Sequence, residues 1–172
     1  MSQPHALSCH QGVDRPYDPV AALLRGRPFE LLQRATTAAA ARAASAAANL
    51  RVEVAGVDLG VNVRLWIRNV RDTQTDAGAS PALCVELSWE AVRTPALFPA
   101  MLAQLLAWPL SPSKTQLEIR GAYWTPLGPL GSAIDAAIGH RIAEAAVQHF
   151  LEDIVTELQR ELPDTASPKQ HV

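Results

Sequence analysis

The fold is decided by residues 114–162, which read KTQLEIRGAYWTPLGPLG over 114–131 and SAIDAAIGHRIAEAAVQHFLEDIVTELQREL over 132–162. Apolar side chains stand at every second position of 115–123, which is the period of a strand with one buried face. Prolines and glycines crowd 126–131 and predict a turn. From Ser132, apolar residues recur at helical spacing until Leu162, and Pro163 ends the pattern. A strand that leads into one long terminal helix predicts an antiparallel sheet packed around that helix, with room for a cavity between them.

Period-two alternation also marks the segments 50–54, 61–68 and 83–89 upstream. Each has one apolar and one polar face, as is typical of an antiparallel sheet with one side in water. A polar loop is expected over 71–81, and charged side chains on the polar faces, such as Glu118 and Arg120, are expected to form solvated cross-strand pairs. Residues 97–110 suit a helix by propensity, but short connections to strands on both sides favour a strand.

The remaining segments have weaker patterns. Residues 29–34 are a candidate edge strand, and the alanine-rich residues 35–49 favour a helix. Residues 1–27 contain several prolines and glycines with little periodicity, and predict a poorly ordered leader. The expected organisation is therefore one domain over 28–162, with the leader before it and a frayed tail over 163–172.

Composition excludes several classes of function. The chain has 172 residues, of which 48% are hydrophobic and 19% charged, as in ordinary globular domains. A net charge of −2 gives no electrostatic footprint for nucleic acid, and no segment is apolar enough for stable membrane insertion. No secretory signal is visible, and two cysteines give no disulfide framework, so we expect a cytoplasmic protein with free thiols. Motifs for nucleotide cofactors, metals and serine nucleophiles are absent from the sequence, so no cofactor, metal ligand or catalytic residue is assigned.

Residues 121–131, GAYWTPLGPLG, followed by Asp135 and by GHRIAE over 139–144, resemble the SRPBCC superfamily. This START-like group includes polyketide cyclase/dehydrase and lipid-transport proteins, and many of its bacterial members have such a stretch before a helix. The resemblance covers 114–155 by motif and 28–162 by order of elements, and it departs at Thr125, where the family often has proline. It implies an α+β helix-grip fold, in which a curved antiparallel β-sheet wraps around a long C-terminal α-helix with an apolar cavity between them. It implies no single activity, because relatives bind lipids, hormones or polyketides, and some are cyclases or act through protein contacts.

The apolar stripe of the terminal helix predicts where such a cavity lies. Its second half has large residues, whereas its first half has Ala133, Ala136 and Ala143. An empty void costs about 24 cal/mol per Å3, so space left beside small residues favours a ligand pocket there. The predicted lining, from the inward strand positions and the helix, is Leu65, Val85, Ile119, Tyr123, Ala136, His140, Ala143, Glu144 and Val147.

Polar groups in this lining are few. His140 and Glu144 are four residues apart on the helix and can interact, and Tyr123 takes the inward phase of its strand. Each is a candidate contact for the polar end of a ligand. A structural hydrogen bond or simple core packing is the alternative for each, and an acid–base pair of His140 and Glu144 stays open as well.

Three functions follow from these observations. The favoured one is non-catalytic binding of an apolar small molecule or lipid between the sheet and the C-terminal helix, by a monomer or homodimer. The enzymatic alternative is a polyketide-type cyclase or dehydratase, for which the polar set is sparse. The third is a protein-interaction module that uses the outer sheet face, where Trp66 falls on the outward phase.

Overall fold

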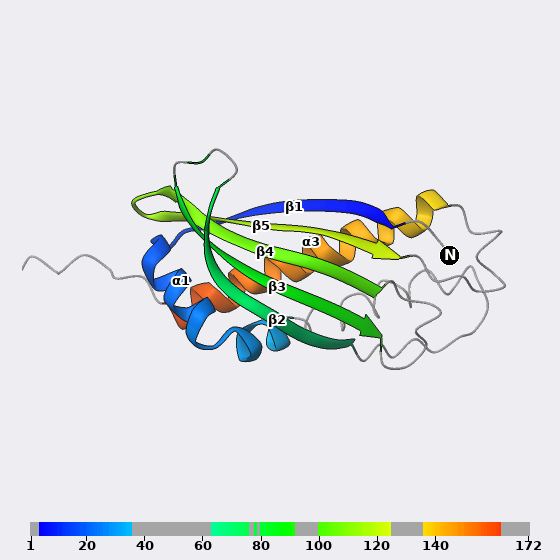
Figure 1. The fold of residues 1–172 in the computed structure, drawn as a ribbon, viewed down its shortest axis with the longest axis horizontal. Coiled ribbons are helices and arrows are strands. Elements are labelled where there is room, and N and C mark those ends of the chain that lie inside the picture. Colours follow the sequence, from blue (N-terminus) through cyan, green and yellow to red (C-terminus); the bar gives the residue numbers. More distant parts are fainter. Residues whose placement is uncertain are drawn as a thin grey trace, which may run out of the picture.

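The computed structural model describes residues 4–35, 63–75, 78, 80–91, 100–124 and 136–162, with the backbone alone at 63, 64, 90, 91, 100, 124 and 136–146. Five strands form one antiparallel sheet in the order β1-β5-β4-β3-β2. Their bounds are His5–Val13 for β1, Val63–Gln74 for β2, Pro81–Ala91 for β3, Ala100–Ser111 for β4 and Lys114–Trp124 for β5. The long helix α3, Ala136–Glu161, runs along one face of this sheet (Figure 1) and contacts β1 and β5. This is the α+β arrangement that the sequence predicts.

The face of the sheet toward α3, here called the inner face, forms the core with the second half of the helix. The alternation of apolar residues predicts most of these positions, because Leu65, Leu83, Val85, Leu87, Leu117 and Ile119 are buried as expected. The inner face includes Leu7, Leu65, Leu83, Val85, Leu87, Leu105, Leu117 and Ile119, and the helix adds Val147, Phe150, Leu151, Ile154 and Leu158. Side chains from both layers therefore fill the space beside the second half of α3.

Two helical segments cover the end of the core where α3 finishes (Figure 1). The helix α1, Tyr17–Gly26, contacts β4 and β5 and buries three residues at helical spacing, which are Val20, Ala21 and Leu24. Residues 28–35 are also helical. Glu161 at the end of α3 forms ion pairs with Arg27 at 3.2 Å and Arg34 at 3.0 Å, and the Arg15 Nε donates to the carbonyl oxygen of Leu162. These contacts fasten the end of α3 to the N-terminal segment.

The N-terminal segment corrects the predicted leader over 1–27. The structure has β1 and α1 there, so the fold begins at His5 rather than near residue 28. The β1 strand has a weak apolar pattern because only Leu7 and Val13 are buried in it, and its place is set by nine paired positions along β5. Pro16 and Pro19, which favour disorder by composition, stand at the N-cap and in the first turn of α1, where a missing N–H costs no hydrogen bond.

Residues 28–35 correct the candidate edge strand at 29–34. Leu31, Leu32 and Ala35 are at most 1% exposed, whereas Phe29 is 54% exposed. Burial at positions i, i+1 and i+4 has the period of a helix, and a strand would have placed Phe29 and Leu31 on the same side. The rest of the predicted alanine-rich helix, the predicted strand at 50–54 and the turn at 126–131 lie outside the described residues.

Two further predictions concern the strands themselves. The favoured strand at 97–110 is confirmed by β4, which lies between β3 and β5. The polar loop at 71–81 is corrected in part, because β2 continues to Gln74 and pairs Arg71 with Cys84 and Thr73 with Ala82. The β2 strand is the edge of the sheet as described, so water can solvate its side chains. Its last residues therefore pair with β3 through the backbone although they lack an apolar pattern. No helix in the described part of the chain is long and apolar enough to span a membrane.

Candidate functional site

The end of β5 lies near the start of α3 (Figure 1), and Tyr123 is the next-to-last residue of that strand. Tyr123 pairs with Met101 on β4 and with His5 on β1. The side chains of Tyr123 and Met101 are 1% and 2% exposed, so both belong to the core. The His5 ring stacks on the Tyr123 ring with centroids 5.2 Å apart and planes 23° apart. The sequence predicts the inward phase of Tyr123, whereas the stack with His5 requires β1, which the sequence pattern does not reveal.

Gly121 brings the backbones of β4 and β5 close together beside this tyrosine. A Cβ atom at Gly121 would lie 2.5 Å from the carbonyl oxygen of Leu102, 2.8 Å from Met101 Cε and 2.9 Å from Ala103 Cβ. Real Cβ atoms essentially never lie within 3.0 Å of such neighbours, so only glycine fits this approach. The close contact sets the local path of the sheet next to Tyr123.

An aromatic pair joins the second half of α3 to the sheet. The Trp89 ring of β3 meets the Phe150 ring of α3 edge to face, with centroids 5.1 Å apart and an interplanar angle of 81°. Such pairs contribute about 0.5–1.5 kcal/mol beyond the area they bury. From Val147 onward the helix packs buried apolar side chains against the sheet, so a ligand held between sheet and helix would have to lie beside residues 136–146.

The structure brings five of the nine predicted lining residues into one core and leaves four outside its described side chains. The five are uncharged and at most 2% exposed, namely Leu65, Val85, Ile119, Tyr123 and Val147. The other four, Ala136, His140, Ala143 and Glu144, lie in the part of α3 whose backbone alone is described. Contact between these four and Tyr123 stays a prediction.

The face of the sheet away from α3, here called the outer face, holds a buried carboxylate. Glu118 has a side chain 4% exposed, which corrects its predicted place in a solvated pair. Its Oε1 accepts hydrogen bonds from Arg120 Nε at 2.6 Å and Ser8 Oγ at 2.9 Å, and His10 Nε2 lies 3.7 Å away. Its Oε2 is buried and accepts no hydrogen bond from the described residues. Two of these neighbours come from β1, so the burial of Glu118 follows from a strand that the sequence reading missed.

The charge of Glu118 is stabilised by its neighbours. Burial raises the pKa of its carboxyl group, but the hydrogen bonds from Arg120 and Ser8 and the positive charges of Arg120 and His10 outweigh that effect. The net pKa is lowered, so Glu118 is ionised at neutral pH and holds the Arg120 side chain on the outer face. Hydrogen bonds to charged groups contribute about 1.5–3 kcal/mol each.

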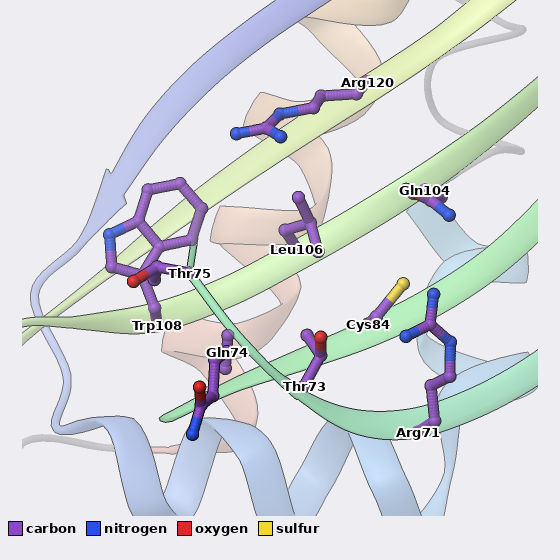
Figure 2. Close-up of a pocket in the computed structure, with 10 residues that line it drawn as sticks. Arg71, Thr73, Gln74, Thr75, Cys84, Gln104, Leu106, Trp108 and Arg120 are labelled. Atoms are coloured by element: carbon purple, nitrogen blue, oxygen red, sulfur yellow. The ribbon is translucent and has the colours of Figure 1, made fainter. Parts of the chain in front are cut away.

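Beside this ion pair lies a hollow of about 200 Å3, here called the outer cleft (Figure 2). Its lining comes from β2, β3, β4 and β5 and from the residue after β2. It consists of Arg71, Thr73, Gln74, Thr75, Ala82, Cys84, Gln104, Leu106, Trp108 and Arg120. Cys84 is 1% exposed, and burial raises the pKa of its thiol, so this cysteine is a poor nucleophile. No group of three or more potential metal ligands occurs among the side chains that the structure describes.

No sequence pattern marks the outer cleft. Its residues on β3 and β4 are two apart, and the lining comes together only through the register of four strands. Thr73 and Thr75 fall in the segment predicted as a loop, where no face could be assigned.

No family model and no curated protein matches this chain. Among solved structures, TTHA0849 from Thermus thermophilus is similar over 91% of this chain and 99% of its own, with 9% identity and a TM-score of 0.51. The chain has the helix-grip fold. The fold that the sequence predicts is thereby confirmed. The Zhui aromatase/cyclase from Streptomyces sp. R1128 matches over 96% of this chain and 100% of its own, with 11% identity and a TM-score of 0.47. Major latex-like protein 151 from Panax ginseng matches over 92% and 97%, with 12% identity and a TM-score of 0.43.

Proposed function

We propose that this helix-grip protein binds an apolar small molecule or lipid between the sheet and the first half of α3, without catalysis. One observation carries the proposal: the buried strand side chains of the described inner face are all uncharged, including those around Tyr123. A ligand that touches this face must be apolar, because a charged group there would be desolvated without a partner. The resemblance to SRPBCC proteins also implies an apolar cavity between sheet and helix.

The proposed mechanism is sequestration from water. Burial of apolar ligand surface supplies about 25 cal/mol per Å2, before the costs of association. Tyr123 provides a hydroxyl group in an otherwise apolar wall, and its ring is supported by the stack with His5. His140 and Glu144 are the proposed partners of a polar ligand end from the side of α3. Large side chains close the other end of the core from Phe150 onward, which confines the ligand to the region of residues 136–146.

The test is native mass spectrometry of the purified protein, combined with an organic extract of the same sample. We expect a bound apolar compound that is released on denaturation, or saturable binding from a panel of fatty acids, sterols and aromatic polyketides. An apo mass that none of these compounds changes would refute the proposal.

Paired substitutions locate the site. Ala143→Leu adds three carbons beside the proposed ligand, and overpacking of this kind costs about 1–3 kcal/mol, or about 5- to 150-fold in affinity. Ala22→Leu is the matched control, because Ala22 is exposed on α1, and it should leave both affinity and melting temperature unchanged. Equal affinity in the two variants would place the ligand elsewhere.

A further inference from the structure

The charged side chains that line the outer cleft are all positive, although each of them belongs to an ion pair. Two guanidinium groups, of Arg71 and Arg120, belong to its lining, and no carboxylate does. The glutamates that pair with them, Glu86 and Glu118, are not part of the lining. A molecule in the cleft therefore meets the positive partner of each pair and not the negative one.

Both arginines are held in place before any ligand arrives. Arg71 donates from Nε and Nη2 to one oxygen of Glu86, each at 3.3 Å. Arg120 is fixed through Nε by the buried carboxylate of Glu118 at 2.6 Å. A guanidinium has five N–H donors in a planar fork and can bind carboxylates on more than one edge. Side chains that are already ordered lose little entropy when they bind an anion.

The register shows how the two arginines can serve one ligand. In the outer-face row, Arg71 pairs with Cys84, Cys84 with Leu106, and Leu106 with Glu118. Arg120 follows two residues after Glu118 on the same face. The strands β2 and β5 are three spacings apart, about 14 Å at about 4.8 Å each, so long side chains from both sides can reach over the strands between them. In Figure 2 Arg71 extends toward Gln104, and Arg120 extends along β5 in the direction of Trp108.

Between the arginines the cleft offers an apolar surface. Leu106 and Trp108 of β4 are half-buried members of its lining, and Gln104 adds an amide on the same strand. The volume of about 200 Å3 is small beside the about 300–1,000 Å3 of pockets for drug-sized ligands. The occupant is therefore a small molecule with both an anionic group and an apolar body.

We propose that the outer cleft binds a small organic carboxylate of about one-ring size. Its carboxylate lies within reach of Arg71 and Arg120, and its apolar body rests on Leu106 and Trp108. Inorganic phosphate would make no contact with the apolar side chains of the lining, and a neutral ring would form no ion pair with the guanidinium groups. This site lies on the face of the sheet opposite the inner face. Binding in the outer cleft can therefore be tested independently of the function proposed above.

The test is a titration of the 15N-labelled full-length chain with sodium benzoate, followed by amide chemical shifts at constant ionic strength. We expect saturable shifts centred on the amides of Thr73, Cys84 and Gln104. Benzyl alcohol, which has the ring without the charge, and inorganic phosphate, which has the charge without the ring, should each bind at least about tenfold more weakly. Shifts that do not saturate, or equal binding of either comparison compound, would overturn the proposal.

Three variants assign the binding to this cleft. Arg71→Gln should weaken benzoate binding at least about tenfold, and Gln104→Glu, which places a carboxylate in the lining, should abolish it. Arg25→Gln is the matched control: Arg25 also forms an ion pair, with Asp72 at 2.6 Å, but does not line the cleft. Arg71 and Gln104 are exposed, so both variants should fold, which the amide spectrum itself reports. Unchanged affinity in Gln104→Glu, or an equal loss in Arg25→Gln, would refute the assignment.

Discussion

Replacement of Gly121 by alanine tests the close approach of β4 and β5 beside Tyr123. The added methyl group would lie within 3.0 Å of three atoms, and one of them, the carbonyl oxygen of Leu102 at 2.5 Å, belongs to a paired backbone. That oxygen must retreat by about 0.5 Å to reach even 3.0 Å, and unlike Met101 Cε it has no side-chain torsion with which to do so. The strain must therefore be taken up by the sheet itself.

The magnitude follows from two opposing effects. Overpacking of a well-packed core costs about 1–3 kcal/mol, and a backbone contact favours the upper end of that range. Replacement of glycine by alanine also restricts the unfolded chain, which returns about 0.4–1 kcal/mol. The net loss for Gly121→Ala is about 2 kcal/mol, which lowers the melting temperature of a chain of this length by about 4–8 °C.

Gly12→Ala is the matched control on the neighbouring strand. Gly12 lies in β1, and a Cβ atom there would meet nothing within 4 Å. Neither glycine has a positive φ, so alanine fits the backbone at both positions. We expect Gly12→Ala to be neutral or up to about 1 kcal/mol more stable. Urea unfolding measures both variants, and equal stabilities would refute the close approach of the two backbones.

Two further predictions concern the outer face. Glu118→Gln should lose about 1–2 kcal/mol of unfolding free energy at pH 7, because it removes the charge that its donors stabilise. The folded-state pKa of Glu118 is lowered, so this contribution is present above its ordinary pKa of about 4.3 and is lost as the pH falls through the folded-state pKa. Urea unfolding at pH 7 and at successively lower pH values measures it, with the exposed Glu30→Gln as control. A difference from wild type that does not shrink as the pH falls would contradict it. In the native protein, iodoacetamide should modify the half-buried Cys9 before Cys84, whose thiol is buried and has a raised pKa. Peptide mass spectrometry locates the adducts. A first adduct on Cys84 would contradict the burial of this residue beneath the outer cleft.

The strands with a clear period of two were predictable because burial alone defines them. Leu83, Val85 and Leu87 alternate with polar or small residues and face α3 as expected. The β4 strand required an argument from topology, since its composition favours a helix. These elements, together with α3, were enough to predict an antiparallel sheet packed around a long helix, and the resemblance of residues 121–144 implied the helix-grip fold.

The N-terminal elements could not be predicted because tertiary pairing defines them. The β1 strand buries only two apolar residues fully, and β5 supplies its register. The helices that follow it begin with prolines or have short apolar patterns that also fit a strand. Once β1 is missed, the burial of Glu118 is missed too, since Ser8 and His10 come from that strand.

The outer cleft could not be predicted for a different reason. Its polar lining residues, such as Arg71, Gln104 and Arg120, lie on outward phases, for which solvation is the ordinary expectation. Only the register of four strands brings Arg71 and Arg120 to the same hollow. A sequence pattern reports which face a residue occupies, but not which residues meet across that face.

The adjacent residues Glu118 and Ile119 couple the two faces of the sheet. Both side chains are buried, Glu118 among outer-face donors and Ile119 in the core beneath α3. A slip of β5 by one residue would exchange them, and a carboxylate without a partner in the apolar layer would cost several kcal/mol. The alternation of Glu118 and Ile119 therefore destabilises a shifted register of β5 against both of its neighbours, β1 and β4. Because Arg120 and Tyr123 are fixed to opposite faces by that same register, the buried carboxylate positions the outer cleft and the inner apolar site together.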